Sequence, residues 1–338
     1  MDKEVDLSGF NIRTDLAIDY IDKKSNLIGV KYKQNTINGL TVTSVTLDSN
    51  NALNKKKGKY ITIEFDDVTD SNNESNVTKV LTGILKKLIN TNFNTLGLVV
   101  GLGNMNSTPD SLGPLTVDNI IVTNHIYSMN CLSKNYSRIS AIKPSVLGST
   151  GIETSDIIEG VVKKIKPDYL IVIDSLSSSS IERLNKTIQI TDTGIHPGSG
   201  IGNERKEISK DTLNIPVYAI GVPTVASASV IVRDTINFIY KNYAFNKENI
   251  KKPSSKLFFN VNYLKKEIKE NINDKRKLLG FIGTLNNEEL DMLLNEVLDP
   301  TGYNFLVTPK EIDFIIKKMS NIVSNSINNS VHKIDKNK

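Results

Sequence analysis

Leu96-Gly-Leu-Val-Val-Gly-Leu-Gly-Asn104 and Tyr169-Leu-Ile-Val-Ile-Asp174 are the two stretches that decide the fold of this 338-residue chain. Each is a short apolar run that ends at glycine, asparagine or aspartate, which is typical of a strand buried on both faces of a sheet. A third run, Pro216-Val-Tyr-Ala-Ile-Gly-Val-Pro223, has the same character. Helical patterns alternate with these runs between residues 96 and 243, and this alternation predicts a parallel, three-layer α/β core.

The regions on either side of this core carry weaker patterns. Apolar and polar residues alternate in the N-terminal part, which predicts half-exposed strands at residues 28–33, 41–47 and 59–65. Helical spacing predicts helices at 77–89, 115–125, 154–165 (capped by Thr154 or Ser155), 228–240, 286–296 and 309–328. The lysine-rich stretch 244–275 suggests a linker or an excursion. We therefore expect one α/β domain over residues 16–338, with its core at about 96–243 and C-terminal helices within 286–328, after an N-terminal arm of residues 1–15.

Composition limits the possible classes of protein. Hydrophobic residues make up 38% and charged residues 23% of the chain, as in a folded globular protein. The net charge of +5 is spread over both signs and does not demand nucleic acid. No apolar run reaches the roughly 20 residues of a membrane span, and no signal peptide is evident. The single cysteine, Cys131, excludes an intramolecular disulfide and a cysteine-based zinc site. We expect a cytoplasmic protein without membrane or direct nucleic-acid partners.

Two aspartates follow the apolar runs. Asp174 comes directly after the second run, and Asp110 lies in Thr108-Pro-Asp110, shortly after the first. Ligands of open α/β sheets bind outside the carboxyl ends of the strands, so we expect the two carboxylates to share one site. Two carboxylates can share a proton, activate a water or bind a divalent metal. Asp110 could instead be an ordinary turn aspartate, whereas a carboxylate at a buried strand end is costly unless it is hydrogen-bonded or functional.

Three glycine-containing loops are further candidates. Gly101-Leu-Gly103-Asn104 lacks the third glycine of a dinucleotide fingerprint, and we interpret its glycines as allowing a close backbone approach that presents Asp110. Gly148–Thr154 leads into a helix and suits contacts with a substrate backbone. The loop 192–203 contains His196, one of three histidines, which could be a general acid, a metal ligand, a donor or a packing residue. The expected substrate and loop residues are Gly103, Asn104, Thr150, Gly151, Glu153, Gly194 and Gly198.

At this point the motifs resemble those of a known family, the germination proteases of spore-forming bacteria. The resemblance runs from Val5 to Leu306-Val-Thr-Pro-Lys-Glu-Ile312, nearly the whole chain. The motifs that carry it are Val99-Val-Gly-Leu-Gly-Asn104, Thr108-Pro-Asp-Ser-Leu-Gly-Pro114, Gly151-Ile-Glu-Thr-Ser-Asp156, Asp192-Thr-Gly-Ile-His-Pro-Gly-Ser-Gly200 and Gly221-Val-Pro-Thr224. They occur in the order of the family.

The resemblance implies a function and a fold. Members of the family are endopeptidases that degrade the small, acid-soluble, DNA-binding proteins of the spore core when germination begins. Their fold resembles that of the hydrogenase-maturing proteases (the phosphorylase/hydrolase-like fold), with a metal-binding acidic site. They are made as zymogens and form homotetramers. The two aspartates proposed for catalysis in the family match Asp110 and Asp174. An aspartic-type pair and a metal-dependent site both remain open.

The resemblance also gives the N-terminal arm a meaning. Arg13-Thr-Asp15-Leu16-Ala17 matches the family's self-processing site, which implies cleavage between Asp15 and Leu16 and makes residues 1–15 a propeptide. Substrates of the family are cut after an acidic residue and before an aliphatic residue followed by alanine. They usually carry a further acidic residue three positions before the one cut, where this chain has Ile12. Cleavage here is therefore expected to be slow or purely intramolecular.

Two rival interpretations make different predictions. In a non-enzymatic nucleotide- or peptide-binding module the aspartates would only order loops, and the chain would not cleave itself. In a metal-dependent protease Asp110, Asp174 and His196 would hold the ion, and a chelator would stop cleavage. The paired-carboxylate interpretation predicts cleavage that needs both aspartates and no metal.

Overall fold

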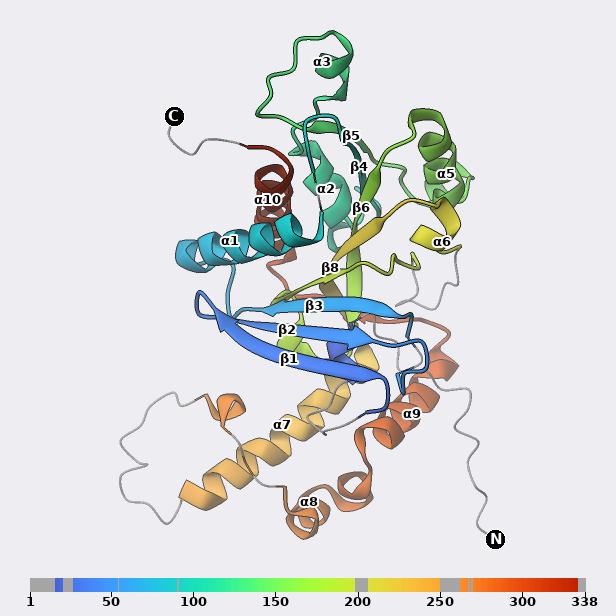
Figure 1. Ribbon diagram of the computed structural model, residues 1–338. Helices are drawn as coiled ribbons and strands as arrows, with labels where there is room; N and C mark the ends of the chain where they lie inside the picture. The colour runs from blue at the N-terminus through green and yellow to red at the C-terminus, as the bar shows by residue number, and fades with distance from the viewer. Residues whose placement is uncertain are drawn as a thin grey trace. The chain divides into compact units, whose positions relative to one another are not determined.

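The computed structural model describes residues 16–20, 27–53, 55–89, 91–197, 206–249, 262–266, 268 and 270–333 (Figure 1). These residues form two compact units. The larger unit takes in Arg13–Ser178, Glu182–Val225 and Thr308–Lys338, and the smaller includes Ser179–Ile181 and Ala226–Val307.

A large mixed sheet is the centre of the larger unit. Its strand order is β1-β2-β3-β7-β8-β6-β4-β5. The bounds are β1 Val30–Ile37, β2 Leu40–Leu47, β3 Gly58–Glu64, β4 Leu96–Gly101, β5 Arg138–Ile142, β6 Tyr169–Ser178, β7 Thr187–Thr191 and β8 Val217–Ser227. β5, β4 and β6 are joined by parallel pairs, whereas β1, β2, β3, β7 and β8 are joined to one another by antiparallel pairs.

The expectation of a parallel core at about residues 96–243 is therefore wrong at β7. The segment that precedes β7, residues 179–186, is shorter than the dozen or so residues that a parallel crossover requires. β7 accordingly pairs antiparallel with β3 and β8, and β3 brings the N-terminal hairpin into the same sheet. The predicted N-terminal strands are all present within a few residues of the expected bounds.

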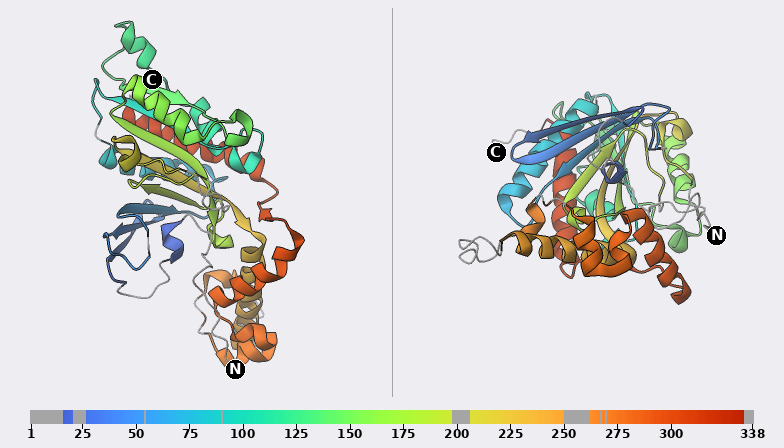
Figure 2. Two further views of the ribbon diagram at one scale, coloured as in Figure 1. Left: turned by 90° about the vertical axis from the view of Figure 1, so that its right-hand side faces the viewer. Right: turned by 90° about the horizontal axis from the view of Figure 1, so that it is seen from below.

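Helices cover both faces of β4 and β6, as a layered α/β core requires. Val99, Ile171 and Ile173 point to one face, where they pack in a cluster with residues of α1 (Ser71–Leu88), α2 (Leu112–Asp118) and α10 (Ile312–Val331). Leu98, Val100, Leu170 and Val172 point to the other face, with Ile158 and Val162 of α5 (Thr154–Ile165). This alternation is the two-residue period of a strand buried on both sides. Figures 1 and 2 show α10 and α5 on opposite sides of these strands.

Local chemistry explains where several helices begin. α1 begins after Asp70, whose side chain accepts the Asn72 N–H at 2.9 Å, a standard N-cap bond. α5 has the predicted bounds, but its N-cap is Glu153, with no side-chain cap bond, rather than Thr154 or Ser155. The predicted helix 115–125 is instead two short helices, α2 and α3 (Asn124–Ser128).

The smaller unit is helical. Its main helix, α7 (Ala228–Asn249), runs past the expected end at Tyr240 into the lysine-rich stretch, and α8 (Ile272–Leu279) begins at the end of that stretch. α9 (Asn287–Leu298) contacts α7, and β9 (Leu306–Val307) pairs with Ala226 and Ser227 at the end of β8. Arg233 is buried in this unit between Asp234 and Asp291, at 2.9 Å and 2.5 Å, and also donates to the Ser179 carbonyl.

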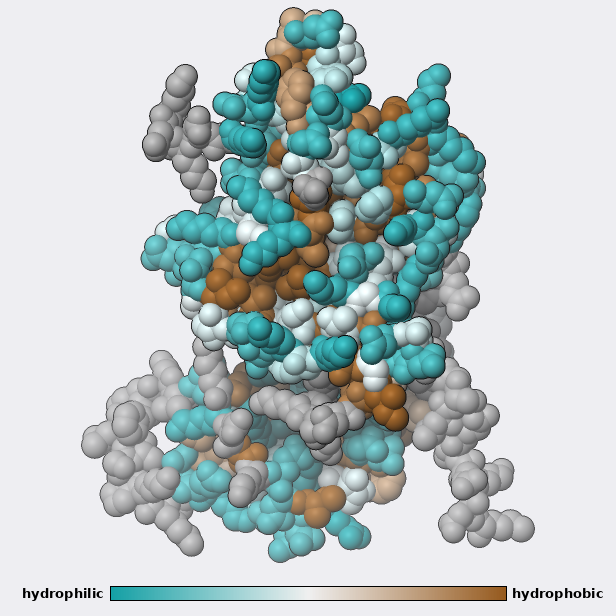
Figure 3. Space-filling model, in the orientation of Figure 1, coloured by the Kyte–Doolittle hydropathy of each residue, from teal (hydrophilic) through white to brown (hydrophobic). Residues whose placement is uncertain are grey.

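The surface is largely hydrophilic on the side seen in Figure 3, with apolar patches between charged side chains. Among the described helices, none is both long enough and apolar enough to span a bilayer.

Candidate active site

The end of β4 is fastened to β6 next to Asp174. β4 ends at Gly101, which pairs with Ile173, and Leu102 N–H then donates to the Ile173 carbonyl at 2.8 Å. Gly113 of α2 packs against the same place, since a Cβ there would lie 2.2 Å from Leu102 O and 2.8 Å from Ile173 O. The loop after β4 therefore leaves the sheet beside the residue before Asp174.

This loop folds back so that Asp110 meets its start. Asn104 N–H lies 2.8 Å from Asp110 Oδ2 and 3.1 Å from the Asp110 carbonyl. Gly103 has φ +107°, and a Cβ on it would come within 2.0 Å of Asp110 O. A side chain at residue 103 would therefore displace Asp110, which agrees with the interpretation of the glycines as permitting close approach. Asp110 itself ends a short 3-10 helix, η2 (Thr108–Asp110), that contacts β6.

Asp174 lies inside β6, not beyond its end as the sequence suggested. The strand continues through a serine-rich stretch to Ser178, because backbone pairing does not require apolar side chains. Asp174 is 7% exposed, and its Oδ1 accepts the Ser175 N–H at 2.9 Å. β4 ends level with Ile173, and η2, which carries Asp110, contacts β6. A site shared by Asp110 and Asp174 stays a prediction that agrees with these contacts.

The chain's own Leu16 packs near Asp174. Leu16 is fully buried in a cluster with Ile18, Leu176 and partly buried Ile195, which we call the Leu16 cluster. Residues two apart on a strand face the same side, so Leu176 and Asp174 share one face of β6. The implied cleavage partner, Asp15, lies outside the described residues. Leu176 and Ile195 were not predicted from the sequence, although the two-residue spacing of Leu176 from Asp174 places both on one face of a strand.

Two polar contacts hold the residues after Leu16. Ala17 N–H donates to Gln189 Oε1 of β7 at 2.7 Å, and both residues are buried. Asp19 carries a side chain only 1% exposed and pairs with Arg183 at 2.5 Å, while Arg183 also reaches Glu64 at 3.4 Å. Ala17 and Asp19 lie in η1 (Ala17–Tyr20), which therefore has both a hydrogen bond and an ion pair to the sheet region.

His196 lies in a separate group of charges. Its side chain is 59% exposed, and Nε2 lies 3.7 Å from Glu207 Oε1. Lys56 bridges Glu207 and Asp211 at 2.7 Å and 2.6 Å. Burial alone would lower the pKa of Lys56, but its hydrogen bonds to Asp211 and Glu207 outweigh this and raise it. A contribution of His196 to catalysis stays a prediction.

The loop of His196 is shaped by another glycine. Gly194 has φ +88°, and a Cβ there would come within 2.3 Å of the Ile208 carbonyl. Next to it, Ile195 and Ile208 exchange backbone hydrogen bonds of 2.9 Å. The close approach needs glycine at this position. Gly198, also expected in this loop, lies outside the described residues.

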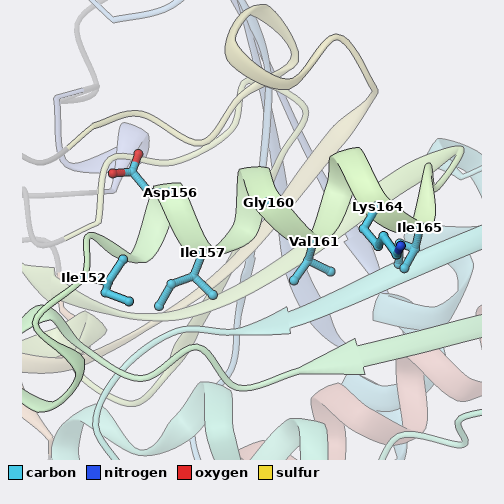
Figure 4. A pocket seen from close by; sticks show the side chains of 7 residues that line it. All are labelled: Ile152, Asp156, Ile157, Gly160, Val161, Lys164 and Ile165. Carbon is cyan, nitrogen blue, oxygen red and sulfur yellow. The ribbon is translucent and has the colours of Figure 1, made fainter.

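The loop before α5 borders a shallow groove. Thr150 ends the short helix α4 (Leu147–Thr150), Gly151 follows in the left-handed region at φ +70°, and Glu153 is the N-cap of α5. A groove of about 440 Å³ runs along α5, lined by Ile152, Asp156, Ile157, Gly160, Val161, Lys164 and Ile165. Figure 4 shows Ile152, Ile157 and Val161 on one side of the helix and Asp156 on the other. Thr150, Gly151 and Glu153 therefore adjoin an open apolar surface.

In the parts of the chain that the structure describes, no three His, Cys, Asp or Glu side chains gather in a group able to hold an ion. η2 and β6 contact each other and carry one carboxyl group each, Asp110 and Asp174, a pair of groups that suits proton transfer to and from a water.

Comparison with known proteins gives a consistent family. A family model described as germination protease matches residues 11–338. The germination proteases of Bacillus cereus (strain ATCC 10987 / NRS 248) and Bacillus mycoides (strain KBAB4) are each 42% identical to this chain. That of Bacillus anthracis (strain CDC 684 / NRRL 3495) is 41% identical. Each of these alignments covers 98% of this chain and 96% of the relative.

Proposed function

This chain belongs to the germination protease family, and from that premise we propose that it starts the breakdown of small, acid-soluble DNA-binding proteins in the germinating spore core. It is a peptidase by family. We further propose that it cuts its substrates after an acidic residue and before an aliphatic residue followed by alanine. The observation that supports a carboxylate mechanism most is the contact of Asp110 with Gly103 and Asn104 beside the strand that contains Asp174.

The proposed reaction needs one water and two carboxyl groups. The ionised carboxylate takes a proton from the water, whose oxygen attacks the scissile carbonyl carbon. The protonated carboxyl gives its proton to the departing amide nitrogen as the C–N bond breaks. Two close carboxyls titrate as a coupled pair, so one can stay protonated while the other is ionised. General acid and base help of this kind contributes about 10²–10⁴-fold to the rate.

We propose that the protein is made as a zymogen and cleaves itself between Asp15 and Leu16. The burial of Leu16 in one cluster with Leu176, two residues beyond Asp174, supports this assignment. The hydrogen bond of Ala17 and the ion pair of Asp19 fix the segment on the C-terminal side of the expected cut. As in the family, a homotetramer is the proposed assembly.

Cleavage of a purified small, acid-soluble spore protein tests the proposed activity. The processed enzyme should produce fragments whose new N-termini begin with an aliphatic residue followed by alanine, identified by mass spectrometry. Asp174→Asn should produce none, whereas Asp118→Asn should match wild type, because Asp118 is surface-exposed and pairs with Lys143. Cleavage at unrelated sequences by wild type would contradict the specificity.

A chelator arm separates the two carboxylate mechanisms. A paired-carboxylate enzyme keeps its rate after treatment with a strong divalent-metal chelator and dialysis. Loss of the rate, with recovery on adding back one divalent metal, would contradict the metal-free mechanism and favour a site in which Asp110 and Asp174 are ligands.

A further inference from the structure

The residues just after the expected cut are buried more completely than a terminal segment requires. Leu16 and Ala17 are both 0% exposed, although residues near a chain end are usually poorly packed. Leu16 contacts Leu176 and Ile18 in the Leu16 cluster, and Ala17 packs in a second cluster with Val45, Leu47 and Tyr60. Two consecutive side chains thus pack in separate apolar clusters.

The sheet makes room for this arrangement. Gly221 of β8 lies directly against Leu176, since a Cβ on residue 221 would come within 2.3 Å of Leu176 Cδ1. The absence of a side chain at residue 221 lets the Leu176 side chain pack against β8 on the face of β6 that it shares with Asp174. Leu176 can therefore contact a residue brought up to the same face of β6.

The backbone of the segment is also held. Gln189 Oε1 accepts the Ala17 N–H at 2.7 Å, and Gln189 is 6% exposed. A buried acceptor aimed at a main-chain N–H can bind any residue except proline at that position, whereas the two side chains pack against apolar residues that can distinguish one side chain from another. This combination is what a peptide-binding subsite needs.

We propose that Leu176, Ile195 and Gln189 form the subsite for the two residues that follow the scissile bond in protein substrates. The inference rests on the proposed self-cleavage between Asp15 and Leu16. Leu176 and Ile195 select the first residue by contact, and Gln189 positions the second through its backbone N–H. The chain's own Leu16 and Ala17 occupy the subsite in the structure, so a substrate enters only when this segment leaves it.

A size swap tests the side-chain contact in the full-length chain. Leu16→Phe should slow self-cleavage about tenfold or more, because Leu16 is fully buried in the cluster and a larger ring at this position would overpack it. Leu176→Ala removes side-chain volume at that place and should restore cleavage in the double variant. Leu40→Ala is the matched control. Leu40 is 4% exposed and Leu176 is 5% exposed, but Leu40 lies in the separate cluster that contains residues of α1, α2 and α10. It should not restore cleavage.

The same swap in trans shows whether substrates use the subsite. The probes are a peptide with the sequence of residues 12–19 and its counterpart with Phe in place of Leu16. For each processed enzyme, kcat/KM for the Phe peptide is divided by kcat/KM for the Leu peptide. This ratio should be about tenfold or more higher in the double variant than in wild type. An unchanged ratio, with both enzymes active, overturns the inference.

Two substitutions at Gln189 test its hydrogen bond to the substrate backbone without changing the Leu16 cluster. Gln189→Met has similar shape without the acceptor and should raise KM for the Leu peptide. Gln189→Glu retains a carbonyl-type acceptor and should restore KM more than Met does. Equal effects of both variants on kcat and on KM would overturn the role of Gln189. Wild type that cleaves neither itself nor any spore protein would instead contradict the proposed function.

Discussion

Gly103 shows how one residue sets the position of a candidate catalytic group. Its φ is +107°, and a hypothetical Cβ would come within 2.0 Å of Asp110 O. Alanine at this position would therefore push Asp110 away from its contact with Asn104. We expect Gly103→Ala to cost on the order of 1–3 kcal/mol of stability and to lower peptidase activity more than tenfold. Thermal unfolding and a peptide-cleavage assay measure the two effects.

Gly83→Ala is the matched control for that change. Gly83 lies in α1, and a Cβ there would meet nothing within 4 Å. Alanine at this position should leave activity near wild type and stability equal or slightly higher. If both glycine variants lost activity to the same degree, the account of Gly103 would be wrong.

Arg183 is the residue that neutralises buried Asp19. Arg183→Met removes a charged partner at 2.5 Å from a side chain that is 1% exposed, so stability should fall by roughly 1–3 kcal/mol. Because the pair lies four residues after Asp15, self-cleavage should slow as well. Breaking the exposed pair of Lys143 and Asp118 with Lys143→Met should change stability by about 1 kcal/mol or less. Denaturant titration compares the two.

For single residues, the sequence predicted the candidate catalytic group Asp174 but not the residues that contact the segment after Asp15. Asp174 was found because a carboxylate after four apolar residues is costly to bury without a purpose, and it is buried. Leu176, Gln189 and Arg183 were not found, because their roles depend on which segment crosses which strand. Leu16 and Ile195 meet at Leu176 from positions far apart in the sequence.

Helix α10 is tied to the rest of the larger unit through a buried histidine at its end. His332 Nδ1 accepts the Ser137 N–H at 3.2 Å, and Nε2 lies 3.2 Å from the Ile121 carbonyl. Since one ring nitrogen accepts and the other donates, the neutral imidazole fits this site. Burial lowers the pKa of His332 in the folded state, while the Ile121 carbonyl opposes the shift.

This lowered pKa predicts a pH dependence of stability. The unfolded chain binds the proton more readily, so the contribution of His332 is complete above its unfolded pKa of about 6.5 and is lost as pH falls through the folded value. We expect His332→Gln to flatten the decline of the unfolding temperature between about pH 7 and pH 5. Exposed His125→Gln serves as the control and should leave the decline unchanged. Parallel curves for wild type and His332→Gln would contradict this.

The predicted bounds were correct for α5, whose apolar pattern extends over several turns. They were wrong where the structure has two short helices, α2 and α3, joined by a short connection. α5 has the predicted bounds, since its apolar face packs on β4 and β6. The helix predicted at 115–125 is interrupted because the chain turns at Asn119 and Ile121, where Asn328 of α10 bonds both backbones. A tertiary contact from the other end of the chain decides this break, so a local pattern does not contain it.

For the whole molecule, the α/β alternation identified the core but not the direction of all strands. Buried runs on β4, β6 and β8 were recognised by composition, and the mixed sheet arose from antiparallel pairing through β7. Strand order is a property of the assembled chain, which short-range patterns do not encode. The hydrogenase-maturing protease fold and the single-domain division stay predictions.

The smaller unit depends on its buried ion triad. Arg233→Met would leave Asp234 and Asp291 buried without their shared cation, and loss of one partner from such a group costs about 3–5 kcal/mol. Burial already raises the pKa of Asp291, against the opposing effect of Arg233. The loss should therefore be largest at neutral pH and shrink as pH falls and Asp291 takes up a proton. Denaturant unfolding of wild type and Arg233→Met at neutral pH and at acidic pH measures the loss of stability. Equal losses at the two pH values would contradict the role given to the charge of Asp291.

Self-cleavage of the full-length chain tests the central claim most directly. Intact mass and N-terminal sequencing over time should show wild type and Asp118→Asn losing residues 1–15 to leave Leu16 first. Asp110→Asn and Asp174→Asn should stay at full mass while keeping a cooperative unfolding transition. Normal processing in either folded variant would contradict a mechanism that depends on the carboxylate pair.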